Sequence, residues 1–264
     1  MGSNRSGMFI KLCCLLSVFA LVLTGCREEK VEQEKELLVY CGITMIKPMT
    51  EIAEIIEKEY GCKILITKGG SGNLLKSIKA NMIGDLYLPG SSSYIQNCFE
   101  EGLITDTVPV GYNKAAMMVK KGNPKDIKDS LDSLTDKRFY VAIGNPESGS
   151  IGRETKKILD KKGIFHQVIK NVQMMTTDSK DLIRLIKDDE ADLVVNWYAT
   201  ATWPENRDSI TVLPISNEFA GKKKLVLGLL RFSSFPEIAK AFMKYASSDK
   251  GRIIFNKYGL YDVK

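Results

Sequence analysis

Residues 68–73 read KGGSGN and lie between an apolar segment, residues 64–67, and an amphipathic run. The apolar residues of that run fall on one face of a helix: Leu74, Leu75, Ile78 and Met82. Glycines let the backbone approach a ligand closely, and Ser71 and Asn73 are residue types that often begin helices. A strand, a glycine loop and a helix start therefore predict a place where unpaired amides attract an anion. A plain glycine turn with a helix cap gives the same pattern, so the rest of the chain must decide.

The first 25 residues have the pattern of an export signal. Arg5 and Lys11 precede an apolar run, residues 12–23, that is too short for a comfortable membrane span. The run ends in LTGC, which resembles the lipobox of bacterial lipoproteins, whose cysteine is diacylated before cleavage. The resemblance implies a lipid anchor on Cys26 and an extracytoplasmic protein at a bacterial membrane, in the periplasm or at the cell surface.

The segment at residues 26–36 is polar and charged apart from Cys26 and Val31, which predicts a tether rather than part of a core. The net charge of the whole chain is +6, and loss of Arg5 and Lys11 with the signal leaves +4. Lysine and glutamate are interspersed, with no dense basic block that contains aromatic residues. We therefore expect no nucleic-acid partner, and we expect a monomer.

Three of the six cysteines lie after the predicted lipid site, namely Cys41, Cys62 and Cys98. Cys41 and Cys62 end one predicted strand and begin the next, so a disulfide between them stays open, although buried free thiols are the preferred interpretation. The single histidine, His166, lies in a lysine-rich stretch and is predicted to be exposed. Without a Cys-x-x-Cys pair the sequence offers no structural zinc site, and we expect no metal and no cofactor.

Short apolar strands alternate with amphipathic helices from residue 37 onward. The strands are predicted at residues 37–41, 64–67 and 85–89, and the helices at 48–60, 74–82 and 94–99. This order predicts an α/β fold with a mainly parallel sheet and right-handed crossovers.

An extended segment at residues 108–113 leads into a second lobe that repeats the scheme. Its strands are predicted at residues 140–143, 172–175 and 192–197, and its helices at 150–162 and 181–187. A strand at residues 225–230 returns the chain to the first lobe, on which helices at 236–247 and 250–257 are expected to pack. We predict one lobe from residues 37–113 and 229–264, a second from 114–228, and a ligand cleft between them.

Five motifs give the chain a resemblance to the periplasmic molybdate-binding proteins of bacterial ABC importers. They are LVYCGIT at residues 38–44, KGGSG at 68–72, GDLYL at 84–88, GNPESGSIG at 144–152 and ADLVV at 191–195. The resemblance covers residues 37–260. It implies the two-lobed periplasmic-binding-protein fold of type II, an ABC permease as partner, and no enzymatic activity.

In that family, hydroxyls and backbone amides hold the anion. The resemblance carries this role to Thr44, where the family has serine, to Ser71 with the adjacent Gly72, to Ser150, and to Ser179 beside Asp178. Residues 149–151 read GSI where the family has Pro-Ala-Gly, so the amide of Ser150 is the expected donor there.

Trp197 occupies the position of the family's tyrosine, and Tyr198 follows it. Strand alternation prevents both side chains from facing one cleft. Tyr198 retains a hydroxyl and is favoured, while the indole N–H of Trp197 is also a usable donor. This departure leaves the identity of the anion open.

These residues favour a binding protein for a fully ionised tetrahedral anion, which only accepts hydrogen bonds. Molybdate or tungstate is the primary expectation. Sulfate, phosphate or a small organic anion is the alternative, although phosphate sites usually need a buried acceptor and neither Thr44 nor Ser71 has one beside it in the sequence. Arg153 is able to add charge, but a solvated helix arginine is the preferred interpretation.

An enzyme is the remote alternative to a binding protein. The glycine loop lacks the pattern G-x-S-x-G, and no Gly-Lys-Ser/Thr follows it as in a P-loop. The sequence shows no base for Ser71 or Ser150.

Overall fold

The computed structural model describes residues 34–261, so the predicted signal, the lipid site and most of the tether lie outside the described residues. The chain from Lys35 onward forms one compact unit. No helix within residues 34–261 is both long enough and apolar enough to cross a membrane. The tether was predicted to extend to residue 36, but the first strand, β1 (Glu36–Gly42), already begins there because Glu36 pairs with Lys63.

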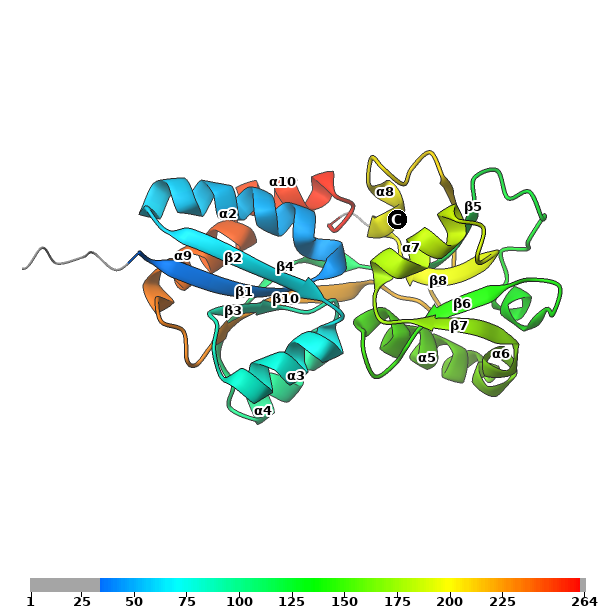
Figure 1. Ribbon diagram of the computed structural model, residues 1–264, viewed down its shortest axis with the longest axis horizontal. Coiled ribbons are helices and arrows are strands. Elements are labelled where there is room, and N and C mark those ends of the chain that lie inside the picture. The colour runs from blue at the N-terminus through cyan, green and yellow to red at the C-terminus, as the bar shows by residue number, and fades with distance from the viewer. Residues whose placement is uncertain (1–33, 262–264) are drawn as a thin grey trace, which may run out of the picture. The chain divides into compact units, whose positions relative to one another are not determined.

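The first sheet has five strands within the described chain (Figure 1). Their order is β2 (Lys63–Gly69), β1, β3 (Leu86–Leu88), β10 (Lys223–Leu230) and β4 (Ile104–Asn113). β1 is parallel to β2 and β3, which confirms the predicted parallel core. β10 is antiparallel to β3 and β4 because β4 and β10 are the strands through which the chain leaves this sheet and returns to it.

Helices cover both faces of the first sheet (Figure 1). One face carries α2 (Ile46–Tyr60), which follows the short 3-10 helix η1 (Ile43–Met45), with α9 (Pro236–Ser247) and α10 (Asp249–Lys257); the other carries α3 (Ser71–Asn81) and α4 (Ser92–Glu100). The side chains of Phe242 and Phe255 are fully buried in the core of the first face. The predicted packing of the two closing helices on the first lobe is therefore confirmed.

The second sheet also has five strands in the part of the chain that is described. Their order is β7 (Val172–Thr176), β6 (Val141–Gly144), β8 (Leu193–Trp197), β5 (Ala115–Lys120) and β9 (Ile210–Leu213). β6 is parallel to β7 and β8, while β5 is antiparallel to β8 and β9. The surrounding helices are η2 (Leu131–Thr135), α5 (Ser150–Lys162), α6 (Phe165–Asn171), α7 (Ser179–Lys187) and α8 (Ala199–Thr202).

We call each sheet with its helices a lobe. The chain crosses from the first lobe to the second between Asn113, the end of β4, and Ala115, the start of β5. It returns through β10, in which Lys223 pairs with Asn113 and Leu230 with Ile104. The boundary predicted at residue 228 therefore falls inside β10, because the whole strand extends the ladder of the first sheet.

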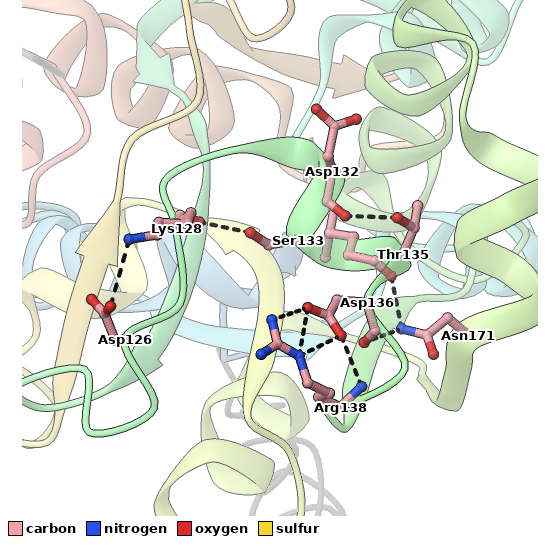
Figure 2. Close-up of polar contacts among 9 residues, drawn as sticks. Asp126, Lys128, Asp132, Ser133, Thr135, Asp136, Arg138 and Asn171 are labelled. Atoms are coloured by element: carbon pink, nitrogen blue, oxygen red, sulfur yellow. Dashed lines mark hydrogen bonds and ion pairs between the residues drawn. The ribbon is translucent and has the colours of Figure 1, made fainter.

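Figure 2 shows the polar contacts that hold the loop between β5 and β6 in the second lobe. The side-chain amide of Asn171 donates to the carbonyl oxygens of Leu134 and Asp136, at 3.0 Å each. The Arg138 guanidinium binds the carboxylate of Asp136, and these hydrogen bonds lower the pKa of Asp136. The contacts anchor the segment that leads into β6, the strand that precedes the loop to α5.

Cys41, Cys62 and Cys98 carry free thiols, as the preferred interpretation predicts. Cys41 and Cys98 are buried, whereas Cys62 is only half-buried because it lies in the turn before β2. Burial raises the pKa of the Cys98 thiol to about 11 and also raises the pKa of Cys41. The side chain of His166 is exposed, as expected.

Candidate functional site

A small pocket lies where the loops of both lobes meet. Its volume is about 10 Å³, close to that of one water-sized sphere. The lining residues are Gly42, Ile43, Thr44, Gly69, Gly70, Ser71, Gly90, Gly149, Ser150, Ile151, Asp178, Ser179 and Trp197. Most of them follow the carboxyl ends of β1, β2, β3, β6 and β7, which is where open α/β sheets bind ligands.

Ser71 begins α3 at the pocket, and its side chain is 2% exposed. Its hydroxyl oxygen accepts a hydrogen bond from the backbone N–H of Gly90 at 3.0 Å. Its carbonyl oxygen accepts one from the hydroxyl of Tyr87 at 2.7 Å, and burial raises the pKa of Tyr87, which keeps this donor protonated. Ser71 is thus held through its carbonyl oxygen and its hydroxyl oxygen, and a hydroxyl that accepts one hydrogen bond can still donate its own proton.

Ser150 begins α5 in the second lobe and repeats this arrangement. Its hydroxyl oxygen accepts a hydrogen bond from the indole N–H of Trp197 at 3.2 Å. Gly149, which precedes the helix, provides no side-chain cap, and Gly149, Ser150 and Ile151 line the pocket at the start of α5. The sequence predicted only the amide of Ser150 as a donor, and the structure adds its hydroxyl.

Trp197, rather than the favoured Tyr198, lines the pocket. The indole of Trp197 is 1% exposed. Tyr198 is half-buried, has helical backbone angles and donates its N–H to the carbonyl of Lys114 at 2.8 Å. The chain turns into α8 at Tyr198, which takes this side chain away from the pocket.

Thr44 lies at the pocket with 2% of its side chain exposed. Its hydroxyl donates to the sulfur of Met45 at 2.8 Å and accepts from the side-chain amide of Asn113 at 3.3 Å. The sulfur is a weak acceptor, so the proton can turn to a stronger one at little cost. Asn113, the last residue of β4 before the chain crosses to the second lobe, is therefore hydrogen-bonded to a residue of the pocket.

Ser179 begins α7, and Asp178 directly before it provides the helix cap. The Oδ1 atom of Asp178 accepts from the N–H groups of Lys180 at 2.8 Å and Asp181 at 3.3 Å. Asp178 is half-buried and is the one carboxylate among the described residues that line the pocket. The pocket therefore includes an acceptor that the sequence spacing did not predict.

Gly72 lies beside the pocket but is not among its lining residues. Its N–H donates to the carbonyl oxygen of Ser148 in the second lobe at 3.0 Å, and that of Asn73 donates to the same oxygen at 3.2 Å. A Cβ atom on Gly72 would stand 2.6 Å from the carbonyl oxygen of Glu147. The N–H of Gly72, which the sequence analysis assigned to the ligand, thus donates to the other lobe in this structure.

Sequence reasoning missed Gly90, whose amide holds Ser71. A Cβ atom at this position would stand 2.3 Å from the Ser150 hydroxyl oxygen, so only glycine allows the two lobes to approach here. A signal was present, because residues 89–91 read PGS between a predicted strand and a predicted helix. That pattern has the same order as the loop at residues 68–73.

Comparison with known proteins places this geometry in context. Residues 37–261 match the family described as bacterial extracellular solute-binding proteins. A protein of Haemophilus influenzae described as a binding protein is 24% identical over 250 residues, which cover 95% of this chain and 99% of that protein.

Two solved structures show the same fold. The periplasmic molybdate-binding protein of Azotobacter vinelandii superposes with a TM-score of 0.74 at 14% identity, over 86% of this chain and 100% of that one. The periplasmic binding protein AfuA of Actinobacillus pleuropneumoniae, with fructose-6-phosphate bound, gives 0.71 at 18% identity, over 85% and 83%. The predicted two-lobed α/β fold of type II is therefore confirmed, while at these identities the likeness shows the fold alone.

Proposed function

Because the chain belongs to the bacterial extracellular solute-binding proteins, we propose that it is the binding component of an ABC importer and captures molybdate or tungstate. One observation carries the proposal. The hydroxyl oxygens of Ser71 and Ser150 each accept an N–H, so each has its proton available for a ligand that only accepts hydrogen bonds. The N-terminal ends of α3 and α5 add partial positive charge from both sides.

The surroundings of these hydroxyls favour binding over catalysis. A backbone amide holds Ser71 and an indole holds Ser150, and neither group is a base that activates a nucleophile. The pocket is bounded by backbone at Gly70, Gly90 and Gly149, where an added Cβ would meet atoms at 2.9 Å or less. A compact inorganic anion suits these walls better than an anion with an organic extension.

Asp178 supports a second candidate, phosphate. Its Oδ1 atom accepts both capping bonds, so Oδ2 can accept a proton from a partly protonated anion. A fully ionised dianion would instead be repelled by this carboxylate. Asp178 therefore separates the two candidates.

Calorimetric titration of the mature chain and its Asp178→Asn variant with molybdate, tungstate, sulfate and phosphate tests this. Asparagine can cap α7 as aspartate does, so the fold is retained. We expect molybdate and tungstate to bind the parent chain, and to bind the variant equally or more tightly because a repulsive charge is removed.

The opposite result, with phosphate bound by the parent and lost in Asp178→Asn, would establish the second candidate. Heat from none of the four anions in the parent chain would refute an inorganic oxyanion as ligand.

We also propose that the protein is held at the membrane through a lipid on Cys26. Replacing Cys26 with serine should release the protein from the membrane fraction of expressing bacteria, whereas Cys62→Ser should leave it there. Equal membrane content of the two variants would refute the anchor.

A further inference from the structure

The first turn of α5 reaches beyond the pocket to the first lobe. Arg153 lies three residues after Ser150, and its guanidinium carbon is 3.9 Å from the centre of the Tyr94 ring. Tyr94 belongs to α4 of the first lobe and is fully buried, while Arg153 is half-buried. The contact is a cation–π interaction that joins the two lobes.

The ring of Tyr94 also packs in the buried apolar cluster of the first lobe that includes Leu74, Ile78 and Tyr87. Arg153 forms no salt bridge with any residue between 34 and 261. The hydroxyl of Tyr94 is buried and has no hydrogen-bond partner within the same part of the chain. Burial raises the pKa of this phenol, although the charge of Arg153 opposes the shift. The ring face, rather than the hydroxyl, is what Arg153 contacts.

Two further contacts surround this pair. On the pocket side, Gly90 lies so close to the Ser150 hydroxyl that an added Cβ would stand 2.3 Å from it. On the other side, the carboxylate of Glu154, with 4% of its side chain exposed, pairs with Lys223 of β10 at 2.9 Å. The first turn of α5 therefore meets the first lobe at the pocket, at α4 and at the crossing strand.

We propose that Arg153 is a positioning residue whose contact with Tyr94 holds the first turn of α5 against α4 and keeps the two lobes closed over the pocket. The proposal rests on the proposed function only for the identity of the ligand, because closure itself can be measured without one. The sequence had favoured a solvated arginine at this position, and the contact with Tyr94 gives it a partner in the other lobe.

The test measures the distance between spin labels on the mature chain carrying Cys26→Ser and Cys62→Ser. Cysteines replace two exposed residues, Lys76 on α3 and Lys170 on α6, which lie in different lobes. Distance distributions are recorded without added anion and with molybdate.

We expect Tyr94→Leu to lower the ratio of short to long distances by roughly three- to tenfold, as loss of a partly buried cation–π contact predicts. Tyr94→Phe keeps the ring and removes a hydroxyl without a partner, so its distribution should match the parent. Arg153→Met should behave like Tyr94→Leu, and Arg153→Lys should recover part of the closed population.

Identical distributions for Tyr94→Leu, Tyr94→Phe and the parent, in both conditions, would overturn the role of Arg153. Arg153→Met provides a second reading on a half-buried position if Tyr94→Leu does not fold. A parent chain that does not respond to molybdate would count against the proposed ligand alone, because the comparison without anion still decides the role of Arg153.

Discussion

Helices α3 and α7 both begin with a serine at the pocket, but their first turns are completed in different ways. Asp178 caps α7 from within its own lobe. α3 has no side-chain cap, and two of its first amides donate to the Ser148 carbonyl of the other lobe. The start of α7 is therefore complete in a single lobe, whereas the start of α3 is completed only by a partner from outside. A helix start like that of α3, whose amides are paired across the lobes, is the kind that changes when the lobes close or when an anion binds.

The largest expected effect on anion affinity comes from a substitution that disrupts the contact between the start of α3 and the second lobe. An alanine Cβ at Gly70 would stand 2.5 Å from the Ser148 carbonyl oxygen and 2.6 Å from that of Thr177, both in the second lobe. Gly70→Ala should weaken anion binding roughly 100-fold, since backbone atoms cannot move aside cheaply. Calorimetry measures this, with Gly221→Ala as the control because nothing lies within 4 Å of its added Cβ. Equal affinities of the two variants would show that α3 does not need the other lobe.

A smaller loss of anion affinity is expected when the hydroxyl of Ser71, the residue after Gly70, is removed. Ser71→Ala removes a donor to the anion and also the acceptor for Gly90, which should cost about 1–3 kcal/mol of binding free energy. Ser77→Ala, at an exposed position on the same helix, is the matched control. If Ser71→Ala bound the anion as tightly as Ser77→Ala, the assignment of the α3 start as a ligand site would fail.

At α7 the comparison predicts a change in stability instead. Asp178→Ala removes a cap that accepts two backbone N–H groups, so the free energy of unfolding should fall by about 1 kcal/mol. Urea denaturation without anion measures it, and Asp178→Asn should restore most of the loss. An unchanged midpoint in Asp178→Ala would mean that this cap contributes no stability to α7.

The smallest effect is expected at Trp197. Trp197→Phe keeps an aromatic ring but loses the indole N–H that holds the Ser150 hydroxyl, so binding should weaken by about 0.5–1.5 kcal/mol. Calorimetry of this variant against Trp203→Phe, which alters a tryptophan outside the pocket, gives the comparison. A loss as large as that of Ser71→Ala would indicate that Trp197 contacts the anion itself.

The loop at residues 68–73 could be predicted because its signals are local: an apolar strand, glycines and a helical stripe adjoin in the sequence. The same holds for Ser150, which was predicted to begin a helix, whereas Ser179 was assigned through the family resemblance because the sequence pattern placed the helix only from residue 181. The preference for Tyr198 over Trp197 rested on its hydroxyl, which says nothing about direction. The strand ends at Trp197 and the chain turns into α8 at Tyr198, so Trp197 rather than Tyr198 lines the pocket.

Contacts between the lobes were beyond the reach of sequence patterns. The acceptor for Gly72 and Asn73 is a backbone carbonyl, that of Ser148, which any residue could supply. Likewise, the sequence around Arg153 is that of an ordinary solvated helix arginine, and only the fold places its guanidinium against the ring of Tyr94. Such pairs depend on how the two lobes pack against each other, and a pattern of neighbouring residues in the sequence does not contain that arrangement.

The pairing of Asn113 with Lys223 has a mechanical consequence. Both crossings between the lobes leave from neighbouring positions of one hydrogen-bonded ribbon, so they cannot shift independently without breaking its ladder. Relative movement of the lobes is thereby limited largely to a rotation about one axis near these residues. Asn113 also donates to Thr44 at the pocket, so one residue belongs both to the crossing between the lobes and to the hydrogen bonds that hold the pocket.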